Sequence, residues 1–578
     1  MKHTRLRFLF AGLAVALAGL ALAGLAGAAP ADVVVGTGTP GSCTESNLNA
    51  ALPLGTRFVF DCGGPATITF TSAIALNGLA VIDGGGVITL TGNNATRLFV
   101  VGDSGMLTLY NIVVEKGYSG GANGGAIYNN SYLSLYNSRI TNSNTDGNHY
   151  GGAIGTIGTV TLHNSELDHN NAGYGGAVDV EGDVGGLYLY DSALVFNTAQ
   201  NAGGGGGAVF LGAGNSLLMS GGEMNHNQAA VAGGALYISA GAGATIVGGS
   251  AGVAYLNVNS TQNSGGAIYN SAGQLSLDQV DLEYNTIPTA TLDYGGGIAN
   301  LGAMSLSNSR IANNQGRYGG GIFVGGNLIS TTAGITHTLF FANLAGVYGG
   351  GLYTNFGGTS LTIEDSAFQY NQAAAGGGLA RTNATLNISK SSFTNNQAQY
   401  GGGLFLQGLP NPADGPYVEI RDTTISGNLA TGQHSGGIDN AALLDLRNVT
   451  IKDNHYGLWG ENSATARLQN SVLDNSLQDC DGDLPTSSGH NLATDSSCNL
   501  TGFGDQSAVP AGLGPLVYDP AVFTQFHMPQ FGSLLINNAG GGCAATDQRY
   551  ATRPDACDIG AIEFGGLLAR LWLPLVRK

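Results

Sequence analysis

Three acidic residues stand at alternate positions in the short sequence VDVEGDV: Asp179, Glu181 and Asp183. Alternate side chains of a β-strand share one face and lie roughly 7 Å apart. Glycosidases that retain or invert configuration need two carboxylates about 5–9.5 Å apart, so this spacing permits glycoside hydrolysis. A Ca²⁺ site and a plain solvated strand face are two other interpretations of the same pattern, and the sequence leaves all three open.

A second acidic group lies near the C-terminus, in the sequence DCDGD. Asp479, Asp481 and Asp483 resemble half of a Ca²⁺-binding loop that lacks the closing Glu. The histidines are scattered: His163 and His169 share one repeat, but no neighbouring Cys or His completes a zinc set. We therefore expect no cofactor, with Ca²⁺ as the one ion that these acids could bind.

The chain as a whole is acidic and rich in glycine. Glycine accounts for 96 of 578 residues, hydrophobic residues make up 43%, charged residues 10%, and the formal net charge is −18. The hydrophobic content argues against a disordered chain, and the glycines lack the every-third-residue period of collagen. Nucleic acid is not an expected partner because binding its phosphates needs basic patches.

The N-terminus has the pattern of a secretory signal peptide over residues 1–28. Lys2, Arg5 and Arg7 precede an apolar run, and the sequence AGA at residues 26–28 offers a cleavage site. No other segment approaches the ~20 apolar residues of a membrane span. The sequence therefore predicts a secreted protein, extracellular or at the cell surface, with no transmembrane span after cleavage.

Six cysteines fall into three pairs that are each close in sequence. An even number of cysteines in an exported chain favours disulfides, although spacing does not prove their connectivity. We predict local bridges, and the paired residues are Cys43 and Cys62, Cys480 and Cys498, and Cys543 and Cys557.

The middle of the chain is built from repeats. A glycine motif followed by Ile, Leu or Val recurs at intervals of 24 to 35 residues between Gly124 and Gly436. Between these motifs lies an apolar-x-apolar pair, two polar residues, a small residue and another apolar residue, as in YLSLYNSRI. Each repeat thus holds three short period-2 segments and no helical period. Such segments bury their apolar faces by stacking as coils about 4.8 Å apart, which predicts a parallel β-helix of ~13–17 turns.

One asparagine recurs three residues after the last apolar position of most repeats. Its amide can bond backbone in its own turn and stack on the asparagine of the next coil. We predict a structural asparagine ladder made of Asn170, Asn197, Asn227, Asn285, Asn314, Asn343, Asn371, Asn396, Asn428, Asn454 and Asn475.

An aromatic residue often follows the apolar position of the glycine motif. Stacked coils would align these side chains in a row. An outward row would pack on the apolar faces of sugar rings, whereas a row beneath the longer loops would be a packing ladder. The candidate glycan-binding residues are Tyr128, Phe210, Tyr237, Tyr269, Phe323, Tyr353 and Phe405.

The repeat resembles that of the chlamydial polymorphic outer membrane proteins, in which F-x-x-N is followed by G-G-A-[ILV]. The pattern stands here as FQYNQAAAGGGL, FTNNQAQYGGGL and LDHNNAGYGGAV, and the resemblance covers roughly residues 120–475. It implies a right-handed β-helix displayed outside the cell, often as an adhesin. The expected fold class is all-β: a right-handed, single-stranded parallel β-helix (solenoid) with N- and C-terminal caps.

The C-terminal part resembles the choice-of-anchor Q domain through the sequences TDQR, RP and CDIGAIE. This resemblance implies surface location or anchoring rather than chemistry. The expected organisation is a signal peptide (1–28), an N-terminal cap with the first coils (29–100), β-helix repeats (101–476), the anchor-like domain (477–564) and a tail (565–578). The tail is either a sorting tail or a strand that closes the last coil.

These features predict a secreted, surface-associated, non-enzymatic β-helix protein. It would act as an adhesin-like or structural display element, with a polysaccharide or cell-surface glycan as the candidate partner. The alternative is an extracellular polysaccharide lyase or glycoside hydrolase, because the same fold hosts such enzymes. A structural spacer that binds nothing is a third possibility, and the sequence does not indicate an oligomeric state.

Overall fold

The structure is a computed structural model that describes most of the chain. The predicted signal peptide (1–28) and most of the predicted tail (565–578) lie outside the described residues. The described residues are 32–567, except 251, 289–292, 327–330, 357, 409–416, 433–434, 462–463 and 519–522.

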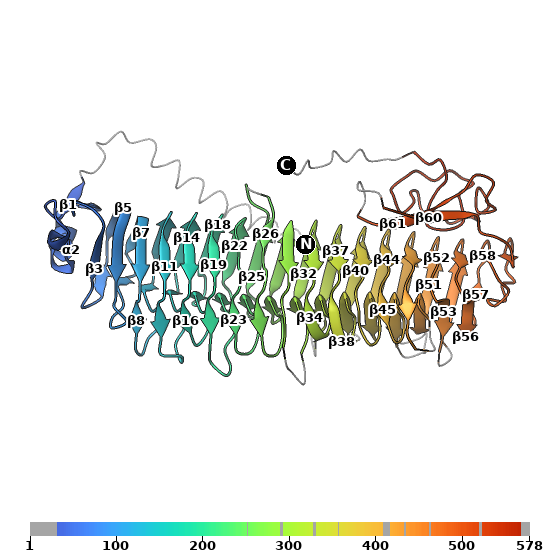
Figure 1. Ribbon diagram of the computed structural model, residues 1–578, viewed down its shortest axis with the longest axis horizontal. Coiled ribbons are helices and arrows are strands. Elements are labelled where there is room, and N and C mark those ends of the chain that lie inside the picture. Colours follow the sequence, from blue (N-terminus) through green and yellow to red (C-terminus); the bar gives the residue numbers. More distant parts are fainter. Residues whose placement is uncertain are drawn as a thin grey trace.

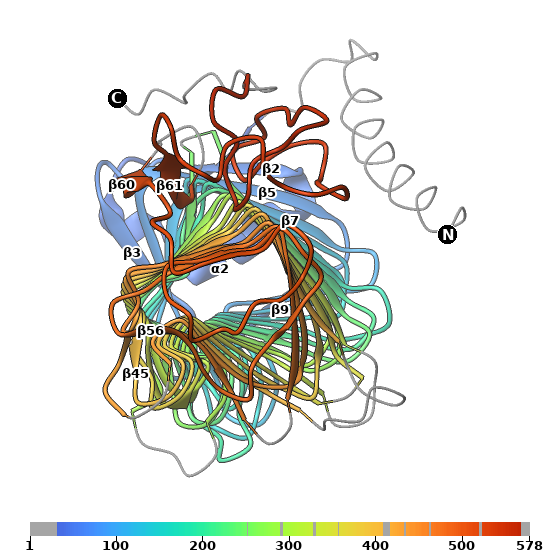
Figure 2. The same ribbon diagram turned by 90° about the vertical axis from the view of Figure 1, so that its right-hand side faces the viewer.

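The chain forms a parallel β-solenoid of about 15 turns, with the strands of successive coils side by side along one axis (Figures 1 and 2). One coil contains β13 (Ile154–Thr156), β14 (Thr159–His163), β15 (Glu166–Asp168) and β16 (Asn171–Ala172). Each pairs in parallel with its equivalent in the next coil, so Ile154 lies beside Val178. The all-β, parallel, stacked-coil class predicted from the repeats is confirmed.

We distinguish three outer surfaces of the solenoid by the strands that form them. Face 1 is the outer side of the 16-stranded sheet that contains β13. Face 2 is the outer side of β14 and its stacked equivalents. Face 3 is the outer side of β15 and its stacked equivalents, which continue through β59 (Gln506–Ser507).

The core is a continuous column of inward aliphatic side chains. Period-2 alternation sends Val178 and Val180 of β17 (Val178–Val180) inward and Asp179 outward. The glycine motif lets the coils pass closely: Gly175 has φ of +54°, and a Cβ on Gly176 would meet a backbone oxygen of the next coil at 2.2 Å. Side chains are therefore excluded at these turns.

The asparagines form one hydrogen-bonded ladder along the solenoid. The backbone N and Nδ2 of Asn170 donate to Oδ1 of Asn197 at 3.0 and 3.1 Å, and Nδ2 also donates to the carbonyl of Ile140. The pattern repeats from coil to coil down to Asn475. It includes Asn259, which the sequence analysis missed because an insertion between β25 (Gly243–Val247) and β26 (Ala254–Tyr255) breaks the repeat spacing.

Three disulfides join the cysteines as the sequence predicts. The sulfur atoms of Cys43 and Cys62, of Cys480 and Cys498, and of Cys543 and Cys557 are bonded. The first lies beside the short helix α2 (Glu45–Ala51), at the N-terminal end of the solenoid (Figure 1), and all three are local in sequence.

The C-terminal segment does not extend beyond the last coil. Strands β56 (Gln478–Gly482) and β58 (Leu492–Ala493) still belong to the solenoid sheets. The chain then turns back and lays the antiparallel hairpin of β60 (Leu513–Tyr518) and β61 (Gln525–Pro529) along the outside of the coils. In Figure 2 this segment sits on one side of the solenoid rather than over its end.

Candidate functional site: a ring-and-acid strip on face 3

The predicted aromatic row lies on face 1 as a stack of rings. Phe210, Tyr237 and Tyr269 occupy equivalent positions of successive coils, with ring centroids 5.0 and 5.1 Å apart. These rings and that of Tyr128 are half-buried, and Arg97 lies over the Tyr128 ring. The rest of the row is more deeply covered: Phe323, Tyr353 and Phe405 are 1%, 3% and 7% exposed.

A second set of tyrosines covers this row. Each stands directly before a glycine motif, at Tyr150, Tyr174, Tyr294, Tyr318, Tyr348 and Tyr400. The ring of Tyr294 lies 4.4 Å from that of Phe323, and the ring of Tyr348 lies 5.3 Å from that of Tyr353. Burial raises the pKa of Tyr353 to about 12. The proposed sugar-stacking role of Phe323, Tyr353 and Phe405 is therefore wrong, because their rings do not reach a ligand.

The three acids at positions 179 to 183 do not share a strand face. Strand β17 ends at Val180, so Glu181 and Asp183 lie in the following turn. Asp179 is only 1% exposed, beside Phe210 in the face 1 row, and neither of its carboxylate oxygens has a hydrogen-bond partner. Burial, with a contribution from the charge of Glu181, raises the pKa of Asp179 well above its ordinary value. The three acids therefore do not form the predicted row on one strand face.

One of the three acids near the C-terminus, Asp479, has a structural role. Asp479 is fully buried and terminates the asparagine ladder: its Oδ1 accepts from the backbone N and Nδ2 of Asn475 at 2.9 and 3.0 Å. Its Oδ2 accepts from the backbone N of Thr494 at 2.7 Å. Asp481 is the next outward residue of the strand, and Asp483 follows in a turn. Among the described residues, no group of three or more His, Cys, Asp or Glu side chains is arranged to hold a metal ion. Of the three acids of the predicted half Ca²⁺ loop, Asp479 ends the asparagine ladder.

Exposed rings gather instead on face 3. Five successive coils each present one: His169, Phe196, His226, Tyr255 and Tyr284. The Phe196 ring stacks between the two histidines, with centroids 5.1 and 4.7 Å away. Phe196, Tyr255 and Tyr284 are 47%, 43% and 54% exposed. The loops and tyrosines that cover face 1 have no counterpart over these rings in the described part of the chain.

Most of these rings occupy one kind of corner. His169, Phe196, His226 and Tyr284 each stand directly before a ladder asparagine and have φ of +54 to +57°. Tyr370 occupies the equivalent corner, in the second coil after the coil that contains Arg310. This left-handed corner turns the backbone around the ladder and leaves the side chain outside. The sequence carried a usable signal, an aromatic residue directly before the ladder asparagine, which the sequence analysis did not use.

Polar side chains run beside the rings, and their amide oxygens accept hydrogen bonds from the backbone of the next coil. Glu223 accepts from Nδ2 of Asn225 at 2.5 Å. The Oδ1 atom of Asn225 accepts from the backbone N of Asn257, and Oδ1 of Asn257 accepts from the backbone N of Glu283, at 2.6 and 2.7 Å. Arg310 pairs with Asp281 and Glu283, so its charge is balanced. The ring-and-acid strip is His169, Phe196, Glu223, Asn225, His226, Tyr255, Asn257, Asp281, Glu283, Tyr284 and Arg310.

A buried carboxylate lies beneath the start of the strip. Asp168 is fully buried, and it accepts from Nε and Nη2 of Arg139 at 2.7 and 2.5 Å and from Thr141 at 2.9 Å. Burial raises the pKa of Asp168, but the bonds from Arg139, His169 and Thr141 outweigh it, and the net pKa is lowered. This group stays ionised and fixes the corner that carries His169.

The geometry of the strip suits recognition of a hydroxyl-rich ligand. Aromatic rings pack on the apolar faces of sugars, and carboxylates and amides bond their hydroxyl groups. A comparison of the chain with models of known protein families, with characterised proteins and with solved structures finds no match. None of the described helices is long and apolar enough to cross a membrane.

Proposed function

We propose that this protein is a secreted, surface-associated, non-enzymatic β-solenoid that acts as an adhesin-like display element and binds a glycan through the ring-and-acid strip. The observation that carries the proposal is the run of exposed rings on five successive coils, His169 to Tyr284, beside a bonded row of acids and amides. Three corner rings recur on successive coils about 4.8 Å apart, Val258 takes the corner of the fourth coil, where Tyr255 lies on the strand instead, and Tyr284 resumes the row on the fifth. This spacing suits a linear polymer that lies along the coils.

The charge of the strip favours a neutral ligand. Glu223, Asp281 and Glu283 are acidic, and the one arginine of the strip, Arg310, is paired with two of them. The whole chain carries a formal charge of −18. Polyanionic glycans would be repelled from such a surface, whereas neutral sugar hydroxyls can donate to its carboxylates.

The surface location rests on separate support. Three disulfides are typical of proteins in oxidising compartments. The repeat and C-terminal resemblances add that the solenoid is right-handed, that it belongs to the polymorphic outer membrane protein type, and that residues 477–564 serve as a choice-of-anchor Q region. On this proposal the solenoid is a rigid rod that holds the strip away from the attachment point.

The test is retention of the purified protein on a panel of neutral and acidic polysaccharides, with product release followed in parallel. We expect retention on at least one neutral polymer, no new reducing ends or unsaturated products, and about tenfold weaker binding by the double variant Tyr255→Ala/Tyr284→Ala. Tyr132→Ala is the matched control, because Tyr132 is 53% exposed but lies on face 2.

Two outcomes contradict the proposal. Failure to bind any polymer in the panel removes the glycan-binding function. Release of product from any polymer favours the alternative, an extracellular polysaccharide lyase or glycoside hydrolase on the same fold.

A further inference from the structure

The C-terminal segment is firmly docked on face 3, on the coils that follow the strip. Thr394 donates to the side chain of Gln525 at 2.5 Å, and Ser426 bonds Nε2 of His527 at 2.8 Å. Arg553, with a side chain only 1% exposed, bonds Asp422 at 3.1 Å. Because these groups are buried and paired, the hairpin is a fixed part of the face 3 surface.

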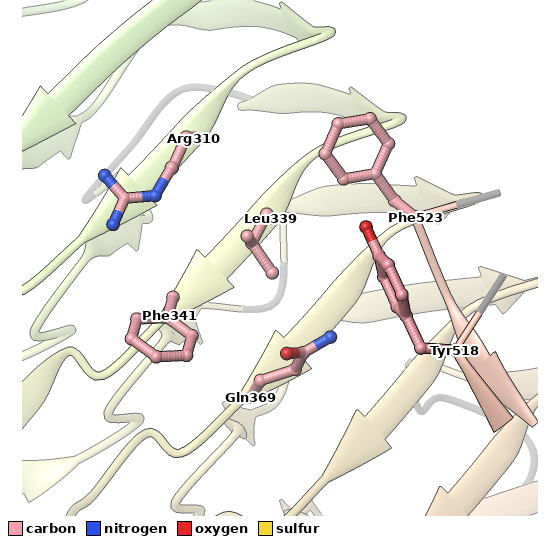
Figure 3. Close-up of a pocket in the computed structure, with 6 residues that line it drawn as sticks. All are labelled: Arg310, Leu339, Phe341, Gln369, Tyr518 and Phe523. Atoms are coloured by element: carbon pink, nitrogen blue, oxygen red, sulfur yellow. The ribbon is translucent and has the colours of Figure 1, made fainter. Parts of the chain in front are cut away.

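A pocket of about 240 Å³ lies at the leading edge of this hairpin. Figure 3 shows the rings of Tyr518 and Phe523, from the hairpin side, facing residues of the solenoid. The pocket thus begins where the strip ends, since Arg310 belongs to both. Its lining residues are Arg310, Leu339, Phe341, Gln369, Tyr518 and Phe523.

The lining fits one small ring with hydroxyl groups. Leu339, Phe341 and Phe523 supply apolar walls, and the amide of Gln369 can both donate and accept. The volume is below the ~300–1,000 Å³ of sites for drug-sized ligands, so one sugar ring suits it better than a larger molecule. Arg310 brings donors without an unbalanced charge, because Asp281 and Glu283 neutralise it.

We propose that this pocket binds one neutral sugar unit, with Tyr518 of the C-terminal hairpin as its outer wall. The inference rests on the proposed function, in that the adjoining sugar units of a bound polymer would continue over the ring-and-acid strip. On this inference, the C-terminal segment takes part in ligand binding in addition to any part in attachment. The ligand is then a neutral glycan and not a polymer of uronate.

Two aromatic residues of the same segment give a matched pair for the test. Tyr518 lines the pocket and is 58% exposed, whereas Phe531 is 94% exposed and lies outside it. The full chain is titrated calorimetrically with neutral hexasaccharides of glucose, galactose, mannose and xylose, and with oligogalacturonate. We expect Tyr518→Ala to weaken binding of the selected hexasaccharide by about tenfold and Phe531→Ala by less than about twofold. Tyr518→Phe, which keeps the ring, should retain binding.

The outcomes separate the pocket from the proposed function. Polymer binding that depends on Tyr255 and Tyr284 but is unchanged in Tyr518→Ala overturns the pocket and leaves the strip. Binding of methyl glycosides of the four sugars, measured by saturation-transfer NMR, tests the pocket alone. Loss of the signal in Tyr518→Ala supports sugar binding in the pocket, even where no polymer is retained. A signal that persists in Tyr518→Ala overturns sugar binding in the pocket. Tighter binding of oligogalacturonate than of every neutral probe overturns the neutral class.

Discussion

The two sets of rings on faces 1 and 3 follow the same coil-by-coil period yet have opposite surroundings. On face 1, Phe323 and Tyr353 are almost fully buried although each points outward from its strand. On face 3, Phe196 and Tyr284 are about half exposed at corners beside the asparagine ladder. A side chain that points outward from its strand is therefore not always exposed. Its exposure depends on whether side chains of a neighbouring segment pack over it.

The segment before the glycine motif makes the difference. It places Tyr294, Tyr318 and Tyr348 over the face 1 row, and the rings pack into a second small apolar cluster outside the main core. The corner before the ladder asparagine is followed by backbone that turns away, and Phe196 and Tyr284 stay 47% and 54% exposed among the described residues of their coils. The face 1 rings are therefore part of the packed structure, whereas the rings of the strip on face 3 are exposed to solvent.

The largest expected difference is in folding stability. Phe323→Ala leaves a cavity in the face 1 cluster, and we expect it to lower the free energy of unfolding by about 3–5 kcal/mol. Tyr255→Ala removes a ring of similar size from a strand on face 3 and should change stability by no more than about 0.5 kcal/mol. Chemical denaturation of the two variants checks the comparison, and equal losses would show that the two rows do not differ in role.

The solenoid and its ladder could be predicted from the sequence because both are periodic and local. The glycine motif recurs where stacked backbones approach to within contact, as at Gly176, and the asparagine recurs where the corner needs a bond to the next coil. Asn259 escaped prediction only because an inserted segment hides its spacing, although its bonds to Asn285 match the others.

The site could not be predicted from the same period. The burial of Phe323 depends on Tyr294 of the preceding coil, and the end of β17 at Val180 separates Asp179 from Glu181 and Asp183. The pocket joins Leu339 to Tyr518, which are far apart in sequence and meet only because the C-terminal segment folds back. No sequence pattern within one repeat predicts contacts between segments that are so far apart in the chain.

The buried carboxyl of Asp179 on face 1 should make folding stability depend on pH. Its pKa is raised in the folded protein by burial in the face 1 row, so the folded state favours the protonated carboxyl. Its contribution to stability is fully present below the unfolded pKa of ~3.9 and is lost as pH rises toward the folded pKa. We expect Asp179→Asn to be more stable than the parent chain at pH 7 and to match it more closely near pH 4.

The measurement is thermal unfolding across pH 4 to 8. Asp183→Asn is the control, because Asp183 is exposed in the turn that follows the same strand. Equal pH profiles for the parent chain and Asp179→Asn would contradict the burial of an unpartnered carboxylate on face 1.

Asp168 on face 3 should show the opposite dependence, with a smaller effect. Its pKa is lowered, because the bonds from Arg139, His169 and Thr141 outweigh the effect of burial, so its contribution is present above the unfolded pKa of ~3.9 and lost as pH falls below it. Asp168→Asn should cost about 1–3 kcal/mol at pH 7, toward the lower end because Arg139 is partly exposed, and less at pH 3. Glu166→Gln is the control: Glu166 lies 3.8 Å from the same arginine, but its side chain is 44% exposed. A cost for Glu166→Gln as large as that for Asp168→Asn would mean that general attraction to Arg139, rather than the buried bonded carboxylate, holds this corner of face 3.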